Sequence, residues 1–434
     1  MTDKKIKMIF DATHLSYMAE KNGMRSAIFF VTKNLLLEFC RNPELDIYLF
    51  CDYKRLEYLK KLVKDGNFPE NCKILDTEKA VNPFMIFMAK IACVCRKENG
   101  KDNFIKKILR FFAFRCFHFF DEHKGISRRL ISLFDKYDVY FSPYEPILPE
   151  VDRAKIKSYL FLHDAIPLVL DGFYKENNFS RDWFKTLMKS LRAENTYFAN
   201  SEHTKNDFIK YSPDITSKNI VVAPLGANEN FYQEKNIEKI EKIKRKYKIP
   251  PDKKYLFSLC NLEPRKNLVF AVKNFIEFIK KNNVEDFIFV IGGGSWVKLV
   301  YHLEKYVENF DDFKDKILKI GYVDDEDLPI LYSGAEMFVY PSFYEGFGMP
   351  ILEAMQCGCP VICSNTSSMP EVIGDCGIMI DPKSDEDLIS AFEKMYFDET
   401  FRNSCHEKGL ERAKIFSWKK CADIIIEKIK SDLN

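Results

Sequence analysis

The sequence predicts an α/β protein built from two Rossmann-like domains that face a central cleft. A chain of 434 residues is too long for one ordinary hydrophobic core, so two domains are expected. Short apolar runs rich in β-branched and aromatic residues alternate with helical stretches along almost the whole chain, which is typical of parallel βα units. These runs fall into two series, separated by a charged segment at residues 234–253.

Each series predicts the strands of one parallel sheet. In the first series we expect strands at residues 6–11, 47–51, 139–142, 159–163, 197–200 and 220–223. In the second we expect them at residues 255–259, 287–291, 317–320, 337–340, 361–364 and 378–380. The charged segment between the series is expected to open the second domain as a helix. We therefore place the first domain at residues 1–233 and the second at residues 234–416, with a ligand site at the carboxyl ends of the strands.

Composition and charge are those of a globular protein with no overall attraction to nucleic acid. The chain is 46% hydrophobic and 30% charged, which is ordinary for a globular domain. The net charge of +2 provides no global field for a polyanion. No uninterrupted apolar run approaches the roughly 18 residues that a membrane span needs.

The start of the chain and the cysteines indicate a reducing cytoplasm. Residues 1–11 read as the first strand and not as a signal peptide. The 13 cysteines are scattered and odd in number, which does not suggest a disulfide framework. Cys93 and Cys95, like Cys357 and Cys359, are separated by one residue and lack the second half of a zinc cluster. We therefore expect no metal site.

Residues 81–120 do not follow the alternation of strands and helices. They carry many phenylalanines among lysines and arginines, and a helical wheel places Lys106, Lys107 and Arg110 opposite an apolar face. We favour a two-helix insertion that packs against its own domain, because further phenylalanines interrupt the polar face. The other interpretation is a basic aromatic helix that lies at the interface of an anionic membrane.

The most informative stretch follows the apolar run at residues 337–340 and reads Pro341-Ser-Phe-Tyr-Glu-Gly-Phe-Gly-Met-Pro350. It predicts a buried strand, a glycine-containing loop and a helix that starts at Pro350. Gly346 and Gly348 allow the backbone to approach a ligand closely. The free N–H groups at the start of such a helix suit a phosphate.

Charged side chains at strand ends suggest what this loop binds. Glu345 on the loop and Glu353 on the helix can accept hydrogen bonds from hydroxyl groups. Arg265 and Lys266 follow the strand at residues 255–259 and can neutralise a diphosphate without a metal, although such a pair is usually part of a solvated loop. Together these residues outline a nucleotide-sugar site.

Two further loops give weaker evidence for a ligand site. Gly292-Gly-Gly294 ends another strand, but glycines also simply terminate strands. The loop that starts at Gly321 contains Val323 and could edge a nucleobase. It also reads as an ordinary βα loop in which Asp324 or Asp325 caps the next helix.

The chain resembles the retaining glycosyltransferases of family 4, which have the GT-B fold and a Glu-x7-Glu motif. The resemblance covers most of the chain and rests on an ordered series of motifs: Glu263-Pro-Arg-Lys-Asn267, Val290-Ile-Gly-Gly-Gly294, Gly321-Tyr-Val323, Glu345-Gly-Phe-Gly348, Glu353-Ala-Met-x-Cys-Gly358, Ser368-Met-Pro-Glu-Val372, His163-Asp164-x-x-Pro167 and Asn200-Ser201-Glu202-x-Thr204-Lys205. It implies that the terminal helix, residues 417–434, crosses back onto the first domain.

The resemblance implies roles for the charged residues. Arg265 and Lys266 would bind the donor diphosphate and stabilise the charge that develops as it leaves. Glu345 would contact the donor sugar, and Glu353 would accept hydrogen bonds from the ribose hydroxyls. His163 would stand near the transferred sugar; it also reads as a strand-end histidine satisfied by the backbone.

The resemblance also implies backbone contacts. Gly346 and the amides of Phe347 and Gly348 would hold sugar hydroxyls, and Val323 would lie beside the base. The family often has paired glycines before the first helix, whereas this chain has only Gly23 there, which we carry over as a donor contact. Arg25 beside it reads equally as a ligand contact and as a surface charge.

The expected activity is retaining transfer of a hexose from a UDP- or GDP-linked sugar, with no metal or other cofactor. The acceptor would be a glycan or a lipid-linked glycan in bacterial surface polysaccharide synthesis, and the protein would be cytoplasmic. The membrane interpretation of residues 81–120 would add peripheral contact with an anionic membrane at the inner face of the cell membrane. One rival is a catalytically idle GT-B subunit that binds sugar or a partner enzyme. A second rival, a glycan phosphorylase, would need a pyridoxal phosphate lysine that no motif indicates.

Overall fold

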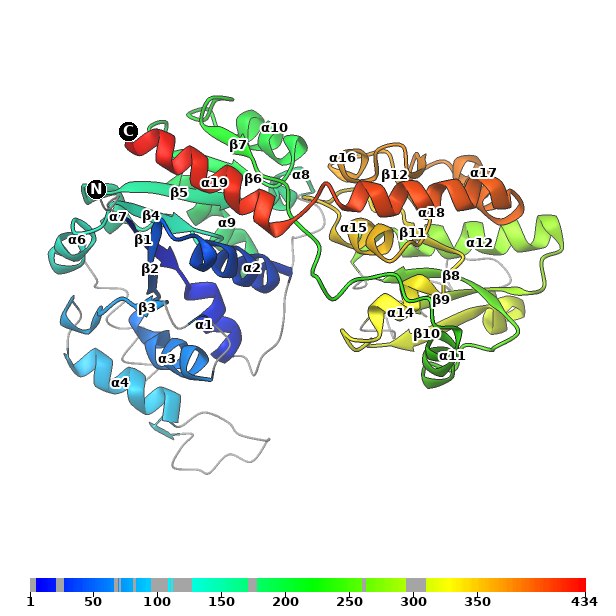
Figure 1. The fold of residues 1–434 in the computed structure, drawn as a ribbon, viewed down its shortest axis with the longest axis horizontal. Coiled ribbons are helices and arrows are strands. Elements are labelled where there is room, and N and C mark those ends of the chain that lie inside the picture. Colours follow the sequence, from blue (N-terminus) through cyan, green and yellow to red (C-terminus); the bar gives the residue numbers. More distant parts are fainter. Residues whose placement is uncertain are drawn as a thin grey trace.

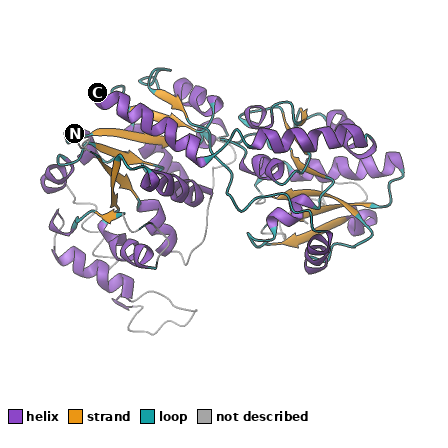
Figure 2. Ribbon diagram, viewed as in Figure 1, coloured by secondary structure: helices purple, strands orange, loops and turns teal. Residues whose placement is uncertain are grey.

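The computed structural model describes residues 5–20, 27–65, 69, 72–80, 83–94, 108–109, 111, 127–170, 178–259, 263–293 and 310–434. Within these ranges the chain forms two parallel sheets, each with helices packed around it (Figures 1 and 2). The first sheet has the strand order β3-β2-β1-β4-β5-β6-β7, and the second has the order β10-β9-β8-β11-β12-β13. The predicted α/β architecture of two Rossmann-like domains is confirmed.

The first sheet contains β1 (Ile6–Asp11), β2 (Leu45–Phe50), β3 (Lys73–Ile74), β4 (Val139–Ser142), β5 (Lys157–Leu162), β6 (Thr196–Ala199) and β7 (Ile220–Val222). Its helices are α1 (Thr13–Glu20), α2 (Ala27–Arg41), α3 (Leu56–Lys64), α4 (Pro83–Val94), α6 (Arg128–Phe134), α7 (Pro149–Arg153), α8 (Ile166–Val169), α9 (Asn178–Ser190) and α10 (Glu202–Tyr211). Short 3-10 turns lie at Tyr53–Arg55 and Glu78–Ala80.

The second sheet contains β8 (Lys254–Leu259), β9 (Phe287–Gly292), β10 (Ile317–Gly321), β11 (Met337–Tyr340), β12 (Val361–Ser364) and β13 (Gly377–Ile380). Its helices are α11 (Ile237–Lys246), α12 (Leu268–Asn282), α14 (Leu328–Ser333), α15 (Met349–Gln356), α16 (Met369–Ile373), α17 (Asp385–Phe397) and α18 (Glu399–Ala413). Further 3-10 turns lie at Pro264–Lys266 and Phe310–Lys316.

Every strand predicted in the two series is present, with ends shifted by at most two residues. The central strands were predictable because helices cover both faces of each sheet, so β4, β9, β11 and β12 are buried at every position. The edge strand β3 was not predicted, because two residues, one of them the exposed Lys73, are too few to show a pattern.

The insertion expected at residues 81–120 is described mainly through α4, which packs beside α3. Phe87 on α4 is 59% exposed, and Ile108 and Phe111 are 50% and 66% exposed. The basic residues Lys106, Lys107 and Arg110 lie outside the described residues. Across the part of the chain that the structure covers, no helix is long and apolar enough to cross a membrane.

The last helix, α19 (Trp418–Leu433), lies on the first domain beside α2, and both ends of the chain are on that domain (Figure 1). Its buried face includes Cys421 and Ile425, and its Asp432 accepts a hydrogen bond of 3.1 Å from the Tyr159 hydroxyl. The chain therefore crosses between the domains twice. The two crossings touch, because a Cβ at Gly226 would lie 2.3 Å from the Trp418 backbone nitrogen.

Candidate active site

Two cations are presented by a tight turn after β8. Residues Pro264–Lys266 form a single 3-10 turn, and Asn267 then adopts a left-handed conformation with φ of 56° before α12 begins at Leu268. The Asn267 side chain donates a hydrogen bond of 2.8 Å to the Pro382 carbonyl, which fixes the turn against the end of the sheet. Arg265 and Lys266 thus follow the carboxyl end of a strand, as predicted.

Both cations contact Glu345. The Glu345 carboxylate lies 2.8 Å from Arg265 Nη1 and 2.7 Å from Lys266 Nζ, and all three side chains are only 10–12% exposed. Lys266 also donates to the Tyr340 hydroxyl at the end of β11. We call Arg265, Lys266 and Glu345 the charged cluster.

The electrostatics of the charged cluster keep Glu345 ionised. Burial alone would raise the pKa of this carboxyl, but the charges of Lys266 and Arg265 hold the pKa below its ordinary value. Burial disfavours the Arg265 cation, yet Glu345 and Glu263 raise its pKa further. The three side chains of the cluster sum to one positive charge, and Glu263, which is 41% exposed and 2.7 Å from Arg265 Nε, balances that charge from the solvent side. An anionic ligand would compete with Glu263 and Glu345 for the two cations.

The glycine loop fits closely against the first domain. A Cβ on Gly346 would lie 2.1 Å from the His163 carbonyl oxygen, so no larger residue fits without moving the backbone. The Gly346 carbonyl accepts hydrogen bonds of 2.8 Å from Ser201 Oγ and 3.1 Å from Thr204 Oγ1. Gly348 is the N-cap of α15, so the helix begins at Met349, one residue earlier than predicted.

Glu353 lies on α15 beside the loop after β10. The carboxyl is partly exposed, and burial together with the negative charge of Asp325 raises its pKa to about 7. Val323 on the same loop is buried, and its Cγ2 atom would lie 3.1 Å from a Cβ at Gly292. Glu353, Val323 and Gly292 therefore belong to one end of the second sheet.

The prediction that Asp324 or Asp325 caps α14 was wrong. The N-cap position belongs to Asp327, and its side chain makes no capping hydrogen bond. Asp327 accepts instead from the Tyr247 hydroxyl at 2.7 Å, and Asp324 accepts from Lys246 at 2.7 Å. The loop is thus tied to α11 by long-range contacts that a local sequence pattern does not report.

His163 lies at the end of β5, where it faces other first-domain side chains. Its Nε2 is 2.7 Å from the Pro143 carbonyl, which makes Nε2 the protonated nitrogen. Burial and the neighbouring His14 lower the pKa of His163 to about 4, against the opposing effect of the Pro143 carbonyl. The imidazole is therefore neutral at pH 7 and cannot supply positive charge.

Several contacts hold the two domains together around the glycine loop. The Tyr344 hydroxyl donates to Asp207 on α10. The Glu371 carboxylate accepts hydrogen bonds of 2.8 Å from the backbone N–H groups of Glu202 and His203, at the start of the same helix. His163 and the charged cluster, which are far apart in sequence, are thereby brought to the same domain contact.

Sequence reasoning missed a group of polar and aromatic residues at the ends of β1 and β4. Asp11 accepts hydrogen bonds from the Tyr140 hydroxyl and the Thr13 amide, and burial together with Glu145 raises its pKa to about 6. Glu145 lies 3.8 Å from His14 Nδ1 and accepts from Trp183 Nε1 at 3.1 Å. Polar residues directly after predicted strands were the signal that could have found them.

Other predicted positions lie elsewhere. Gly23, Arg25 and Gly294 lie outside the described residues. Phe347 is buried, with its ring packed edge-on against Phe416, so only its backbone remains a candidate contact. Cys357 and Cys359 are buried in the core.

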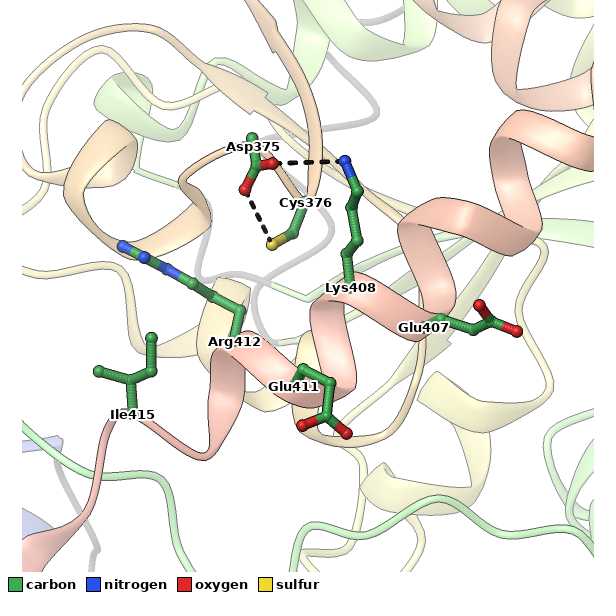
Figure 3. A pocket seen from close by; sticks show the side chains of 7 residues that line it. All are labelled: Asp375, Cys376, Glu407, Lys408, Glu411, Arg412 and Ile415. Carbon is green, nitrogen blue, oxygen red and sulfur yellow. Dashed lines mark hydrogen bonds and ion pairs between the residues drawn. The ribbon is translucent and has the colours of Figure 1, made fainter.

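A pocket beside α18 is lined by Asp375, Cys376, Glu407, Lys408, Glu411, Arg412 and Ile415 (Figure 3). Its two cations already have partners: Lys408 pairs with Asp375 at 3.3 Å, and Arg412 donates to the carbonyls of Glu371 and Val372. None of its lining residues belongs to the charged cluster or the loops around it. We therefore do not assign the substrate site to this pocket.

Part of the second domain matches a known protein family. Residues 239–412 match the family model of glycosyl transferases group 1. The O-antigen chain mannosyltransferase B of Escherichia coli is 35% identical over 247 residues, covering 57% of this chain and 63% of that protein. The serotype-specific mannosyltransferase WbdA of Escherichia coli is 27% identical over 304 residues, covering 70% of this chain and 37% of that protein. The chain thus spans less than two thirds of the length of either relative.

Solved structures show the same architecture at low identity. The Anabaena protein Alr3699/HepE, solved in complex with UDP and glucose, superposes with a TM-score of 0.65 at 15% identity, covering 98% of this chain and 100% of that one. Sucrose-phosphate synthase from Thermosynechococcus elongatus gives a TM-score of 0.64 at 15% identity, covering 98% and 99%. The chain therefore has the GT-B fold, and its residues 239–412 match the glycosyl transferases of group 1.

Proposed function

We propose that this protein is a retaining glycosyltransferase that moves a hexose from a nucleotide diphosphate sugar to a glycan or lipid-linked glycan in surface polysaccharide synthesis. The observation that carries the proposal is the charged cluster, in which two cations that are only 11–12% exposed converge on Glu345 at the carboxyl ends of the second sheet. The similarity to O-antigen mannosyltransferases makes mannose the first hexose to test.

In this reaction the main contribution of the protein would be to stabilise charge. The acceptor hydroxyl oxygen would bond to the anomeric carbon as the bond from that carbon to the diphosphate breaks, and the hydroxyl proton would pass to the departing phosphate oxygen on the same face. Arg265 and Lys266 would stabilise the negative charge that builds on the leaving group. These two cations supply the positive charge, so we expect turnover to continue in the presence of a chelator.

The other residues would position the donor. When the diphosphate takes over the two cations, Glu345 becomes free to accept hydrogen bonds from the sugar hydroxyls. Glu353 would bind the ribose, Val323 would lie beside the base, and Gly346 with the amides of Phe347 and Gly348 would hold the sugar. His163, being neutral, would act as a hydrogen-bonding partner beside the sugar and not as a cation. Gly23 remains a proposed donor contact.

Thermal unfolding with UDP, GDP and ADP and their sugar conjugates, with chelator present, tests the proposal. Ligand at about 100 times its dissociation constant stabilises the native state by roughly 2.7 kcal/mol. We expect a shift with one base only, which Glu353→Ala abolishes, and a product that keeps the anomeric configuration of the donor by NMR. No shift with any nucleotide, together with no transfer, would favour the idle subunit.

We also propose that the first domain touches an anionic membrane from the cytoplasmic side. The exposed Phe87, Ile108 and Phe111 provide apolar side chains near the basic stretch of the sequence at residues 96–110. Co-sedimentation with vesicles of anionic phospholipid tests this. Binding at low salt that Phe87→Ser weakens is expected, and no binding at low salt would contradict it.

A further inference from the structure

Tyr144, Glu145 and Trp183 lie next to the site proposed above, but the transfer chemistry does not use them. The rings of Tyr144 and Trp183 are stacked, with centroids 4.3 Å apart and an angle of 14° between their planes. Both side chains are partly exposed, and Trp183 also donates from Nε1 to Glu145 Oε2 at 3.1 Å. The result is a partly exposed aromatic surface with a carboxylate at its edge. The His14 ring also packs against Tyr144, with centroids 4.7 Å apart, so part of the Tyr144 ring is already covered.

The elements that carry this surface are fixed to one another. Tyr144 and Glu145 follow β4, where Ser142 Oγ donates to the Glu145 carbonyl at 2.6 Å. Trp183 lies on α9, and Ser190 at the end of that helix accepts from the Ile147 amide at 3.3 Å. The aromatic pair is therefore held in place before any ligand arrives, which limits the entropy lost on binding.

The charges around the surface select the class of ligand. Glu145 is 23% exposed, with His14 Nδ1 3.8 Å from its other oxygen. Asp11 lies close enough for Glu145 to raise its pKa. Two neighbouring carboxyl groups disfavour a phosphate or another anion but accept hydrogen bonds from neutral hydroxyls. An apolar ring face beside a hydroxyl-accepting carboxylate matches a neutral pyranose.

The surface lies near the charged cluster. The Tyr144 ring centroid lies 5.8 Å from that of His163, whose carbonyl packs against Gly346 beside Glu345. A sugar on the aromatic pair would therefore lie on the first-domain side of the donor sugar.

We propose that Tyr144, Trp183 and Glu145 form the subsite that binds a neutral sugar unit of the acceptor glycan. Trp183 and Tyr144 supply the stacking surface, and Glu145, oriented by Trp183, accepts hydroxyl hydrogen bonds. That the bound sugar belongs to the acceptor rests on the proposed transferase function. That a sugar binds at this place rests on the geometry of the first domain.

The test measures sugar binding by the full chain and, separately, the kinetics of transfer. Mannotriose, maltotriose and chitotriose serve as binding probes in saturation-transfer NMR without donor. We expect at least one trisaccharide to bind, and Trp183→Ala and Glu145→Gln to weaken that binding by about tenfold. In transfer assays with the same trisaccharide, the acceptor KM should rise by a similar factor while the donor KM stays within about twofold. Trp183→Phe, which keeps an aromatic ring, should retain more binding than Trp183→Ala.

Phe397→Ala is the matched control, because Phe397 is a 58% exposed aromatic residue of the second domain. Circular dichroism and thermal unfolding establish that each variant is folded. Binding of none of the three trisaccharides, or equal binding by wild type and both folded variants, would overturn the subsite. If a trisaccharide binds in a Trp183-dependent way but the protein binds no nucleotide, the sugar subsite is supported and the proposed transferase function is rejected.

Discussion

The Tyr344 hydroxyl donates a hydrogen bond of 2.5 Å to the Asp207 carboxylate, and so joins the glycine loop of the second domain to α10 of the first. The carbonyl of the same tyrosine accepts from Arg265 Nη1 at 3.1 Å, and Glu345 is the next residue. One loop therefore carries both the contact between the domains and the carboxylate of the charged cluster. The relative position of the domains and the orientation of the charged cluster are consequently coupled.

Tyr344→Phe tests this coupling. Loss of the hydroxyl removes the shorter contact of the buried Asp207 and leaves His203 Nε2 at 3.4 Å from its carboxylate. We therefore expect destabilisation of about 1–3 kcal/mol and a fall in kcat/KM on the order of tenfold. Tyr396→Phe is the control, because the Tyr396 hydroxyl donates to Asp286 within the second domain, away from the site. Chemical denaturation and initial rates measure both effects. Equal activity in the two variants would contradict the coupling.

Lys266→Ala should lower kcat on the order of 10²–10³, as expected for the loss of one group that stabilises developing charge. Lys273→Ala is the control, since Lys273 pairs with Asp385 at the surface and lies outside the charged cluster. Steady-state rates with saturating nucleotide sugar provide the measurement. Near wild-type turnover of Lys266→Ala would remove this lysine from the mechanism.

Glu345→Ala should impair both turnover and folding. The substitution leaves two largely buried cations close together without their shared counter-ion. Arg265 keeps the partly exposed Glu263 at 2.7 Å, so the cost should stay below the roughly 3–5 kcal/mol of a fully buried group. We expect a fall in turnover on the order of 10²–10³ at temperatures where the variant is still folded. Added nucleotide diphosphate should restore part of the lost thermal stability, because its charge replaces the carboxylate. A variant of unchanged stability would show that the cations are solvated.

Glu353 should make donor binding depend on pH. Its pKa near 7 means that the anion, which accepts hydrogen bonds most strongly, forms as the pH rises through about 7. Affinity for the nucleotide sugar should therefore increase from pH 6 to pH 8 in isothermal titration, and Glu353→Gln should bind weakly with little pH dependence. The stability of the free protein depends on pH in the opposite direction from donor affinity. A carboxyl pKa raised from 4.5 stabilises the fold at low pH, and this contribution is lost as the pH rises towards 7. If donor affinity changes equally with pH in the wild type and in Glu353→Gln, Glu353 is not the group whose ionisation controls donor binding.

Glu371→Ala should loosen the contact between the domains. The carboxylate accepts from two N–H groups at the start of α10, and the loss of such a cap costs about 0.5–2 kcal/mol. Asp398→Ala is the control, because Asp398 caps α18 inside the second domain. We expect a larger radius of gyration in solution scattering for Glu371→Ala only. An identical scattering curve would show that the cap does not set the domain arrangement.

The sequence predicted the features that depend on local pattern. The strands were visible because buried parallel strands are short apolar runs between helices, and the charged cluster was visible because Arg265, Lys266 and Glu345 each follow such a run. The start of α15 was misplaced by one residue, because Gly348 rather than Met349 takes the N-cap position.

The features that were missed depend on residues far apart in the chain. Tyr344 and Asp207 are separated by 137 positions, and Glu145 and Trp183 by 38. No single segment contains both partners, so neither pair leaves a local pattern. The insertion shows a different limit. Its sequence suggested two helices, and the structure describes the backbone of α4, whereas Lys106, Lys107 and Arg110 fall outside the described residues.

The contact between the two chain crossings has a mechanical consequence. Gly226 on one crossing and Trp418 on the other are packed backbone to backbone. Two covalent connections that touch at one point resist separation of the domains but still allow them to rotate about that point. The opening motion of the two domains is therefore expected to be a rotation about residues 226 and 418. Atoms far from this pivot would move further than atoms close to it. The pivot itself needs no rearrangement, so the start of α19 can stay on the first domain while the domains open and close.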